Sequence, residues 1–436
     1  MNKRFRASIA MLVVAALAAA CGATSPGTGA SPAGSAAATV AAPITLQFAS
    51  FAWQKATVDA HNKIVADWNA KNPNITVKIV TVDVNSVHDK LLTTFQGGTA
   101  ADIVHDESAD IGGFAGQGFL ADLSSLIPGD LKADIPQGIW DTVTFNKKIA
   151  GVPTILQTYS VFVNKKMLAD AKVELPTAAS PWTWDKFAQV AKQLTTTDRY
   201  GVGWGLKSPA ATVMSMSLNF NGNFFYNEGG KNVVKFGTAE QQVLKRIYDL
   251  AYTDKSLSPT TLGQSGPDIL PGFFAGKYAM IVGGNYVAQQ MVEQAPAGFD
   301  WAMLPLLKGD SQAQSANPQT LSIAAQSKNP KEAMQFIAFY MQSQNLASVA
   351  IGDWLIPVST SAGKAVTTIT GGKNSWDVNV ASTPSLRLAP FQTLDAYPQW
   401  KSQIAQPAFQ QYFANKIDLA TVGTQLTEGW TKVGGK

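Results

Sequence analysis

The single cysteine of this 436-residue chain, Cys21, stands at the end of a short apolar run near the N-terminus. With no second cysteine, disulfides, thiolate metal sites and CxxC redox chemistry are excluded, so the fold must depend on apolar cores. Residues 1–20 have a basic start followed by twelve apolar residues. That run is too short for a helix that spans a bilayer, which needs about 20 residues. The pattern predicts a secretory signal peptide over residues 1–20.

The sequence around Cys21 predicts lipidation. The run LAAAC resembles the lipobox of bacterial lipoproteins, in which the cysteine is acylated and becomes the new N-terminus. The usual leucine three positions before the cysteine is replaced by Ala18, and Leu17 lies one position further upstream. Residues 22–42 are almost entirely Gly, Ala, Ser, Thr and Pro, a composition typical of a flexible tether. We therefore expect residues 21–42 to hold a globular body, which starts at residue 43, on the outer face of the cell membrane.

Length and charge limit the class of protein further. Single cores stop growing near ~250–300 residues, so the remaining chain predicts about two domains. Removal of Lys3, Arg4 and Arg6 with the leader lowers the formal charge from +4 to about +1, and no Lys/Arg run follows residue 20. Nucleic acid is therefore a poor candidate partner. The three histidines show no metal-ligand spacing, and the sequence predicts neither a metal nor a cofactor.

Strand and helix patterns alternate along the chain, which is typical of an α/β fold. Residues 44–48 and 75–79 alternate apolar and polar positions as strands do. The helix predicted between them ends at Asn72-Pro73, because proline restricts the residue before it and cannot continue a helix. Further on, Thr183 predicts the N-cap of another helix.

A series of short motifs follows in order along residues 44–430. The motifs are NPNITV at 72–77, GGTAADIV at 97–104, FAGQGFLADL at 114–123, GVP at 151–153, VNK at 163–165, TWDKF at 183–187, FAGKYAM at 274–280 and GDWLIPV at 352–358. Together they resemble the family 1 extracellular solute-binding proteins, the carbohydrate-uptake branch. Ala101 stands where the family usually has proline, Val163 where it has tyrosine, and the last motif has one extra residue.

This resemblance implies a fold and a function. The fold would be the two-lobed, type II periplasmic-binding-protein-like α/β fold, with hinge strands and an interlobe ligand cleft. The first lobe would hold 43–155 and 306–358, and the second 156–305 and 359–436. The protein would be a non-enzymatic, monomeric binding lipoprotein that delivers a mono- or oligosaccharide to an ABC permease with a separate ATPase.

Eight residues are candidates for contact with a sugar. The resemblance places two cleft loops after the strands at 102–104 and 274–280, and tryptophans at three expected turns offer rings on which the C–H face of a sugar can stack. For each tryptophan, packing in a core is an equally good interpretation. The candidates are Trp53, Asp106, Glu107, Asp110, Trp204, Asn285, Tyr286 and Trp354.

Other functions are weighed against sugar binding. The same fold could bind a polyol, a glycerol phosphate ester or a polyamine. A phosphate ligand would require Arg or Lys, which the cleft loops largely lack. The carboxylates of these loops are compatible with a polyamine, which therefore stays an alternative ligand. A secreted glycosidase or an adhesion module is the other class. The acidic residues around Asp106 fall on one loop, which does not supply two carboxylates flanking a glycosidic bond.

Overall fold

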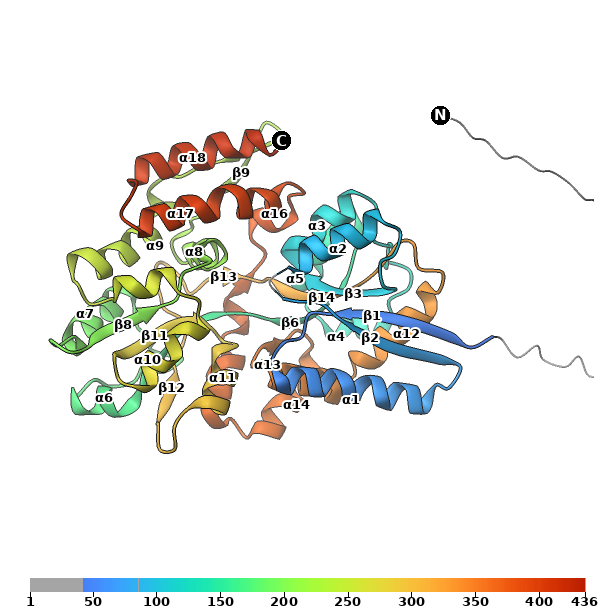
Figure 1. Cartoon of the computed structure of the whole chain (residues 1–436), viewed down its shortest axis with the longest axis horizontal. Coiled ribbons are helices and arrows are strands. Elements are labelled where there is room, and N and C mark those ends of the chain that lie inside the picture. The colour runs from blue at the N-terminus through green and yellow to red at the C-terminus, as the bar shows by residue number, and fades with distance from the viewer. Residues whose placement is uncertain (1–41, 85, 436) are drawn as a thin grey trace, which may run out of the picture. The chain divides into compact units, whose positions relative to one another are not determined.

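The computed structural model describes residues 42–84 and 86–435, in which strands and helices alternate (Figure 1). The predicted signal peptide, Cys21 and all but the last residue of the predicted tether lie outside the described residues. Within the described ranges, no helix has the length and apolar character needed to cross a membrane. The two expected strands are present as β1 (Ile44–Ser50) and β2 (Ile75–Thr81). Between them, α1 (Lys55–Lys71) ends at the Asn72 cap, as the sequence predicts.

The first of two main sheets has six strands in the order β15-β6-β14-β3-β1-β2. Strand β1 is parallel to β2 and β3, whereas β14 runs antiparallel to both β3 and β6. We call this sheet and its helices the first lobe. Its further elements are β3 (Ile103–Glu107), β6 (Val152–Leu156), β14 (Pro318–Ile323), β15 (Ile356–Pro357), α2 (Val87–Gln96), α3 (Ser108–Gly116), α4 (Gly129–Asp134), α5 (Gln137–Trp140), α12 (Pro330–Tyr340), α13 (Ser343–Asp353) and α14 (Thr360–Thr370), with the hairpin of β4 (Thr144–Phe145) and β5 (Lys148–Ile149).

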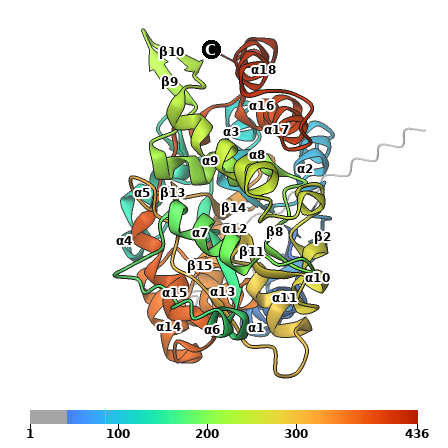
Figure 2. The same cartoon turned by 90° about the vertical axis from the view of Figure 1, so that its left-hand side faces the viewer.

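The second main sheet has four strands in the order β12-β7-β11-β8, and with its helices it forms the second lobe. Thr183 caps α7 as predicted, because its hydroxyl accepts a hydrogen bond from the backbone N–H of Lys186. A hairpin of β9 and β10 projects from this lobe beside the C-terminal helix (Figure 2). The elements are β7 (Tyr159–Asn164), β8 (Tyr200–Trp204), β9 (Phe225–Glu228), β10 (Lys231–Val234), β11 (Tyr278–Gly284), β12 (Trp301–Met303), α6 (Lys165–Asp170), α7 (Trp184–Leu194), α8 (Pro209–Ser217), α9 (Thr238–Tyr248), α10 (Leu270–Phe274), α11 (Val287–Gln294), α16 (Tyr397–Trp400), α17 (Gln406–Phe413) and α18 (Leu419–Lys432).

The chain passes between the lobes three times. It runs directly from β6 into β7, returns between β12 and β14, and leaves the first lobe again between α15 (Trp376–Ala381) and α16. The second and third crossings pair with each other, because β13 (Gln314–Ser315) lies parallel to β16 (Leu386–Arg387). The predicted lobe boundaries at 155, 305 and 358 stay a prediction.

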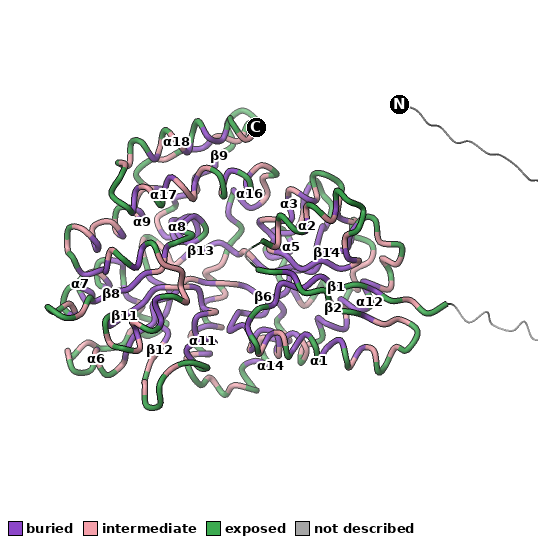
Figure 3. Tube along the Cα trace, in the orientation of Figure 1, coloured by how far each residue is buried: buried purple, intermediate pink, exposed green. Residues whose placement is uncertain are grey.

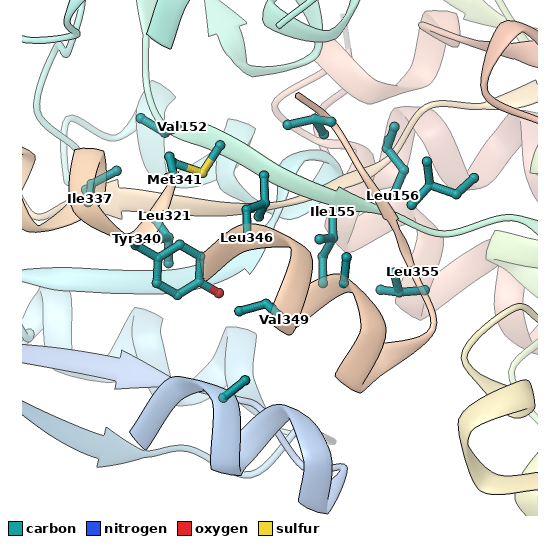
Figure 4. Packing of buried hydrophobic residues seen from close by; sticks show 14 of the residues in the cluster. Val152, Ile155, Leu156, Leu321, Ile337, Tyr340, Met341, Leu346, Val349 and Leu355 are labelled. Carbon is teal, nitrogen blue, oxygen red and sulfur yellow. The ribbon is translucent and has the colours of Figure 1, made fainter. Parts of the chain in front are cut away.

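The core of the first lobe lies under its central strands. Every residue of β6 and of β14 is buried, as expected for strands covered on both faces. Ile155 and Leu321 face Ile337 and Tyr340 of α12 and Val349 of α13 (Figure 4). Burying one such side chain contributes about 1.5–3 kcal/mol. The central strands are accordingly buried, whereas the edge strand β2 has a single buried residue, Val77, and most other exposed residues lie on the outer faces of helices and on loops (Figure 3).

Candidate functional site

A small cavity of about 80 Å³ lies where the lobes meet. Both lobes and all three crossings contribute to its wall. The lining residues are Glu107, Ala109, Gln157, Tyr159, Ala211, Ser315, Asn317, Phe391, Tyr397 and Lys401. Pockets that hold small ligands usually measure about 300–1,000 Å³. The lobes therefore lie closer together here than they would around a bound small molecule.

Glu107 is the carboxylate that lines this cavity from the end of β3. Its Oε2 accepts a hydrogen bond of 2.8 Å from the side-chain amide of Asn317, on the second crossing. The Oδ1 of Asn317 in turn accepts from the Ser108 hydroxyl and the Ala109 N–H, both at 3.0 Å. Burial, reinforced by the neighbouring Asp110 carboxylate, raises the pKa of Glu107 to about 7. Asn317 thus fixes the position of a carboxyl group that changes charge near neutral pH.

Asp110 and Lys401 form an ion pair between the lobes. Asp110 lies in the first turn of α3, and its Oδ1 is 2.8 Å from Lys401 Nζ in the second lobe. Lys401 also lies over the ring of Tyr397, 5.8 Å from its centroid. Burial lowers the pKa of the lysine, but the charges of Asp110, Tyr397 and Glu107 outweigh that effect and raise it. Lys401 is therefore a cation held at the cavity wall.

Asp106 lies behind this site instead of lining it. It is 1% exposed, its Oδ1 accepts from the Glu107 N–H, and its Oδ2 is 3.8 Å from Nδ1 of His88. Burial raises the pKa of Asp106. Burial lowers the pKa of His88, but its interaction with the nearby Asp106 carboxylate raises it more. The Asp106 carboxylate therefore does not line the cavity, but its charge helps to raise the pKa of Glu107, which does.

Trp53 and Tyr286 form an aromatic contact across the lobes. The ring centroids are 6.2 Å apart and the planes meet at 74°, an edge-to-face arrangement. Trp53 follows β1 and is 43% exposed, whereas the half-buried Tyr286 follows β11. Gln157 of the cavity wall lies close to Gly284, so this pair is near the cavity although neither ring lines it. These two predicted residues are therefore brought together.

Asn285 is fully buried and supports the first crossing. Its backbone N–H donates to the Thr158 carbonyl at 2.9 Å, and its Oδ1 accepts from the Thr158 N–H at 3.2 Å. Its Nδ2 donates to Oδ1 of Asn379, in α15. The structure thus places this predicted site residue in the hinge.

Trp204 and Trp354 pack in cores. Trp204 is 1% exposed and stacks on Trp184, with ring centroids 6.2 Å apart. Trp354 is 3% exposed and stacks on Trp376 at 4.7 Å. Its positive φ of 56° ends α13 in the left-handed region. Neither ring reaches the cavity wall, so the packing interpretation describes both residues here.

Of the ten residues that line the cavity, the sequence predicted only Glu107. No family motif matches the segment that holds Phe391, Tyr397 and Lys401. The crossings that hold Gln157 and Asn317 show no periodic pattern from which the direction of their side chains could be predicted. A lone lysine among apolar and amide residues, as in YPQWKSQ, was the available signal for Lys401. Within residues 42–84 and 86–435, no three His, Cys, Asp or Glu side chains gather as metal ligands would.

A larger hollow lies elsewhere. It measures about 1,210 Å³ and opens on the outer surface of the first lobe, beside the end of α1, α4 and α12. Trp68, Lys71, Asp134 and Phe339 are among its lining residues. It receives no residue from the second lobe or from the crossings, so movement of the lobes would leave it unchanged.

Two α/β lobes, three crossings and a polar cavity where they meet define a two-lobed binding protein. The chain belongs to the bacterial extracellular solute-binding proteins, whose family model matches residues 53–347. It is 39% identical over 422 residues to an uncharacterized lipoprotein in the oleD 5′ region of Streptomyces antibioticus, with 96% of this chain and 90% of the relative covered.

Several solved structures have a similar fold. An ABC substrate-binding protein of Listeria monocytogenes, in complex with cycloalternan, superposes with a TM-score of 0.76 at 21% identity and covers 90% of this chain and 100% of its own. The GacH receptor of Streptomyces glaucescens gives 0.76 at 18% identity, covering 90% and 98%. The maltotriose-binding protein of Thermus thermophilus gives 0.73 at 17% identity, covering 89% and 100%. At these identities the likeness establishes the two-lobed fold.

Proposed function

We propose that this protein is the substrate-binding component of an ABC importer and captures a sugar between its two lobes. The observation that carries the proposal is the cavity itself, because amide, carboxylate and aromatic side chains from both lobes meet there. Neighbours of the same fold were solved with cycloalternan, acarbose and maltotriose, which are carbohydrates.

The side chains around the cavity suit the surface of a sugar. Hydroxyls need hydrogen-bond partners, and Glu107, Gln157 and Asn317 supply donors and acceptors. The C–H faces need flat apolar surfaces, and Tyr159 and Tyr397 supply rings on the cavity wall. Opening of the lobes would add the exposed face of Trp53 and the ring of Tyr286 to this set. From the predicted site we therefore keep Trp53, Glu107, Asp110 and Tyr286 as ligand residues.

Capture requires the lobes to separate and then close again. The present cavity of about 80 Å³ is too small for a sugar ring with its hydroxyls. The crossings allow hinge motion, and contacts from one ligand to both lobes would stabilise the closed arrangement. Binding energy would thereby select the conformation that a permease receives.

The location follows from the family and from the N-terminal sequence. Members are extracellular, and a relative is named a lipoprotein. We propose that Cys21 carries the lipid, that residues 22–42 form the tether, and that the protein is a monomer. The permease and its ATPase would be separate chains, and no group of the site is assigned to catalysis.

A thermal-shift panel tests this function. The mature chain with Cys21→Ser would be scanned with glucose, galactose, mannose, cellotriose, maltotriose and the amino sugars glucosamine and galactosamine, and with glycerol, glycerol 3-phosphate and spermidine as non-sugar ligands. A sugar at a hundred times its Kd should stabilise the fold by about 2.7 kcal/mol. Stabilisation by spermidine or glycerol 3-phosphate and by none of the sugars, amino sugars included, would contradict the proposal.

A further inference from the structure

The charges at the cavity do not balance. Glu107 and Asp110 bring two carboxylates from the first lobe, and Lys401 brings one ammonium from the second. The ammonium is paired with Asp110 at 2.8 Å. Glu107 receives only the neutral amide of Asn317, and in the described part of the chain its Oε1 has no hydrogen-bond donor. One carboxylate oxygen at the cavity is thus left for a ligand.

The groups behind Glu107 do not supply the missing cation. Asp106 adds a third carboxylate, and the imidazole of His88 faces that residue at 3.8 Å. If His88 is protonated, it balances Asp106, and Glu107 is left with only the charge of Lys401, which already pairs with Asp110. A buried, unpaired carboxylate is costly, and the raised pKa of Glu107 reflects this cost.

The other walls of the cavity are suited to a positive charge. Tyr159, Phe391 and Tyr397 line it together with Glu107. The face of an aromatic ring attracts a cation within about 6 Å. Lys401 Nζ already lies 5.8 Å from the centroid of Tyr397, so this wall holds an ammonium in the closed arrangement. Aromatic rings beside an unpaired carboxylate form a site for a second ammonium.

We infer that the solute is a sugar with a protonated amino group, and that this ammonium binds Glu107 while Lys401 keeps Asp110. The inference rests on the proposed function, because it names the class of sugar that enters the same cavity. A neutral sugar could donate a hydroxyl to Glu107 but would leave the charge in place. An anionic sugar would add a fourth negative group beside three carboxylates.

Matched sugars separate these possibilities. Three pairs of sugars differ only in an amino group in place of the hydroxyl at C2. The pairs are glucose with glucosamine, galactose with galactosamine, and cellotriose with the glucosamine trisaccharide of the same linkage. Calorimetric Kd values for these pairs and for maltotriose would be measured at pH 7, where the amino sugars still carry their proton and Glu107 is near its pKa, so that binding of the cation favours the ionised carboxylate. A hydrogen bond to a charged group contributes about 1.5–3 kcal/mol, so we expect at least one amino sugar to bind roughly 10- to 150-fold more tightly than its neutral partner.

Variants assign that preference to the site. Glu107→Gln keeps the shape and removes the charge, and it should abolish the preference, whereas Glu174→Gln on the exposed surface should preserve it. Lys401→Met frees the Asp110 carboxylate and should strengthen the preference. If the melting curve shows that Glu107→Gln does not fold, the preference of Lys401→Met for amino sugars over neutral sugars tests the inference instead.

Each outcome bears on one of the two claims. Neutral sugars that bind as tightly as their amino partners, or a preference unchanged in Glu107→Gln and Lys401→Met, would overturn this inference and leave the sugar-binding function standing. If no sugar of either kind binds, the proposed function fails with it.

Discussion

Lys401 Nζ lies 2.8 Å from Asp110 Oδ1, and this contact joins the second lobe to the first beside the cavity. The side chains are 23% and 15% exposed, so solvent and salt screen their attraction only in part. Nearby, Trp53 and Tyr286 make a second contact between the lobes. Both contacts join the lobes in the closed arrangement, and a solute must therefore compete with them or build on them.

Removal of the carboxylate should favour an open protein. In Asp110→Asn the ammonium of Lys401 loses its ionic partner when the lobes close but regains water when they open. A fully buried pair would lose about 3–5 kcal/mol, and for this partly exposed pair we expect about 1–2 kcal/mol. Small-angle scattering should give a larger radius of gyration than the wild type without ligand. Asp198→Asn on the exposed surface is the matched control, and equal radii for all three proteins would argue against the ion pair as a closing contact.

Two tryptophans should respond oppositely to truncation. Trp204→Ala removes a ring that stacks on Trp184 in the core, and it should cost about 3–5 kcal/mol of unfolding free energy with little loss of affinity in the folded fraction. Trp53→Ala removes a 43% exposed ring, so the melting temperature should change little. Affinity for the sugar should fall about 30-fold or more if the ring is a stacking platform. Calorimetry and thermal denaturation of both variants check this, and full affinity in Trp53→Ala would remove Trp53 from the site.

Glu107 should make stability depend on pH. Below pH 4.5, its ordinary pKa, the carboxyl group is protonated in both the folded and the unfolded chain. Between pH 4.5 and about 7 the unfolded chain binds fewer protons, so the free energy of unfolding falls as pH rises and levels off above the folded pKa. Glu107→Gln should therefore gain stability relative to the wild type across this interval. Melting temperatures from pH 4 to pH 8 measure the difference, and a constant offset between the two proteins would show that Glu107 titrates normally.

The proposed anchor is tested by fractionation. Cys21→Ser removes the thiol that would carry the lipid, and the protein should move from the membrane fraction to the soluble fraction. Its melting temperature should match that of the globular body in the wild type. Retention of Cys21→Ser in the membrane fraction would contradict lipid anchoring.

The sequence predicted local structure better than the site. The strand β1, the end of α1 at Asn72 and the Thr183 cap all depend on neighbouring residues, whose pattern is visible in the chain. The cavity instead joins residues from distant segments. Asp110 and Lys401 are 291 positions apart, and nothing local indicates that they meet.

The tryptophans illustrate the same limit. Turn positions suggested that Trp204 and Trp354 could be exposed, but a turn does not determine which way a ring points. Trp184 and Trp376 cover them with stacked rings at centroid distances of 6.2 and 4.7 Å. Trp53 has no such cover and stays exposed.

The claim that a sugar enters between the lobes can be tested by locking them. A Cβ placed on Gly116 of α3 would lie 3.1 Å from Cγ of Asp395, which precedes α16 in the second lobe. This spacing suits a disulfide between Gly116→Cys and Asp395→Cys. The double variant, made in a Cys21→Ser background to leave no other thiol, would be titrated calorimetrically with the sugar identified by the panel, before and after reduction. Gly116→Cys alone is the control. We predict no binding while the disulfide is intact and recovery of wild-type affinity on reduction; full affinity in the oxidised protein would contradict binding between the lobes.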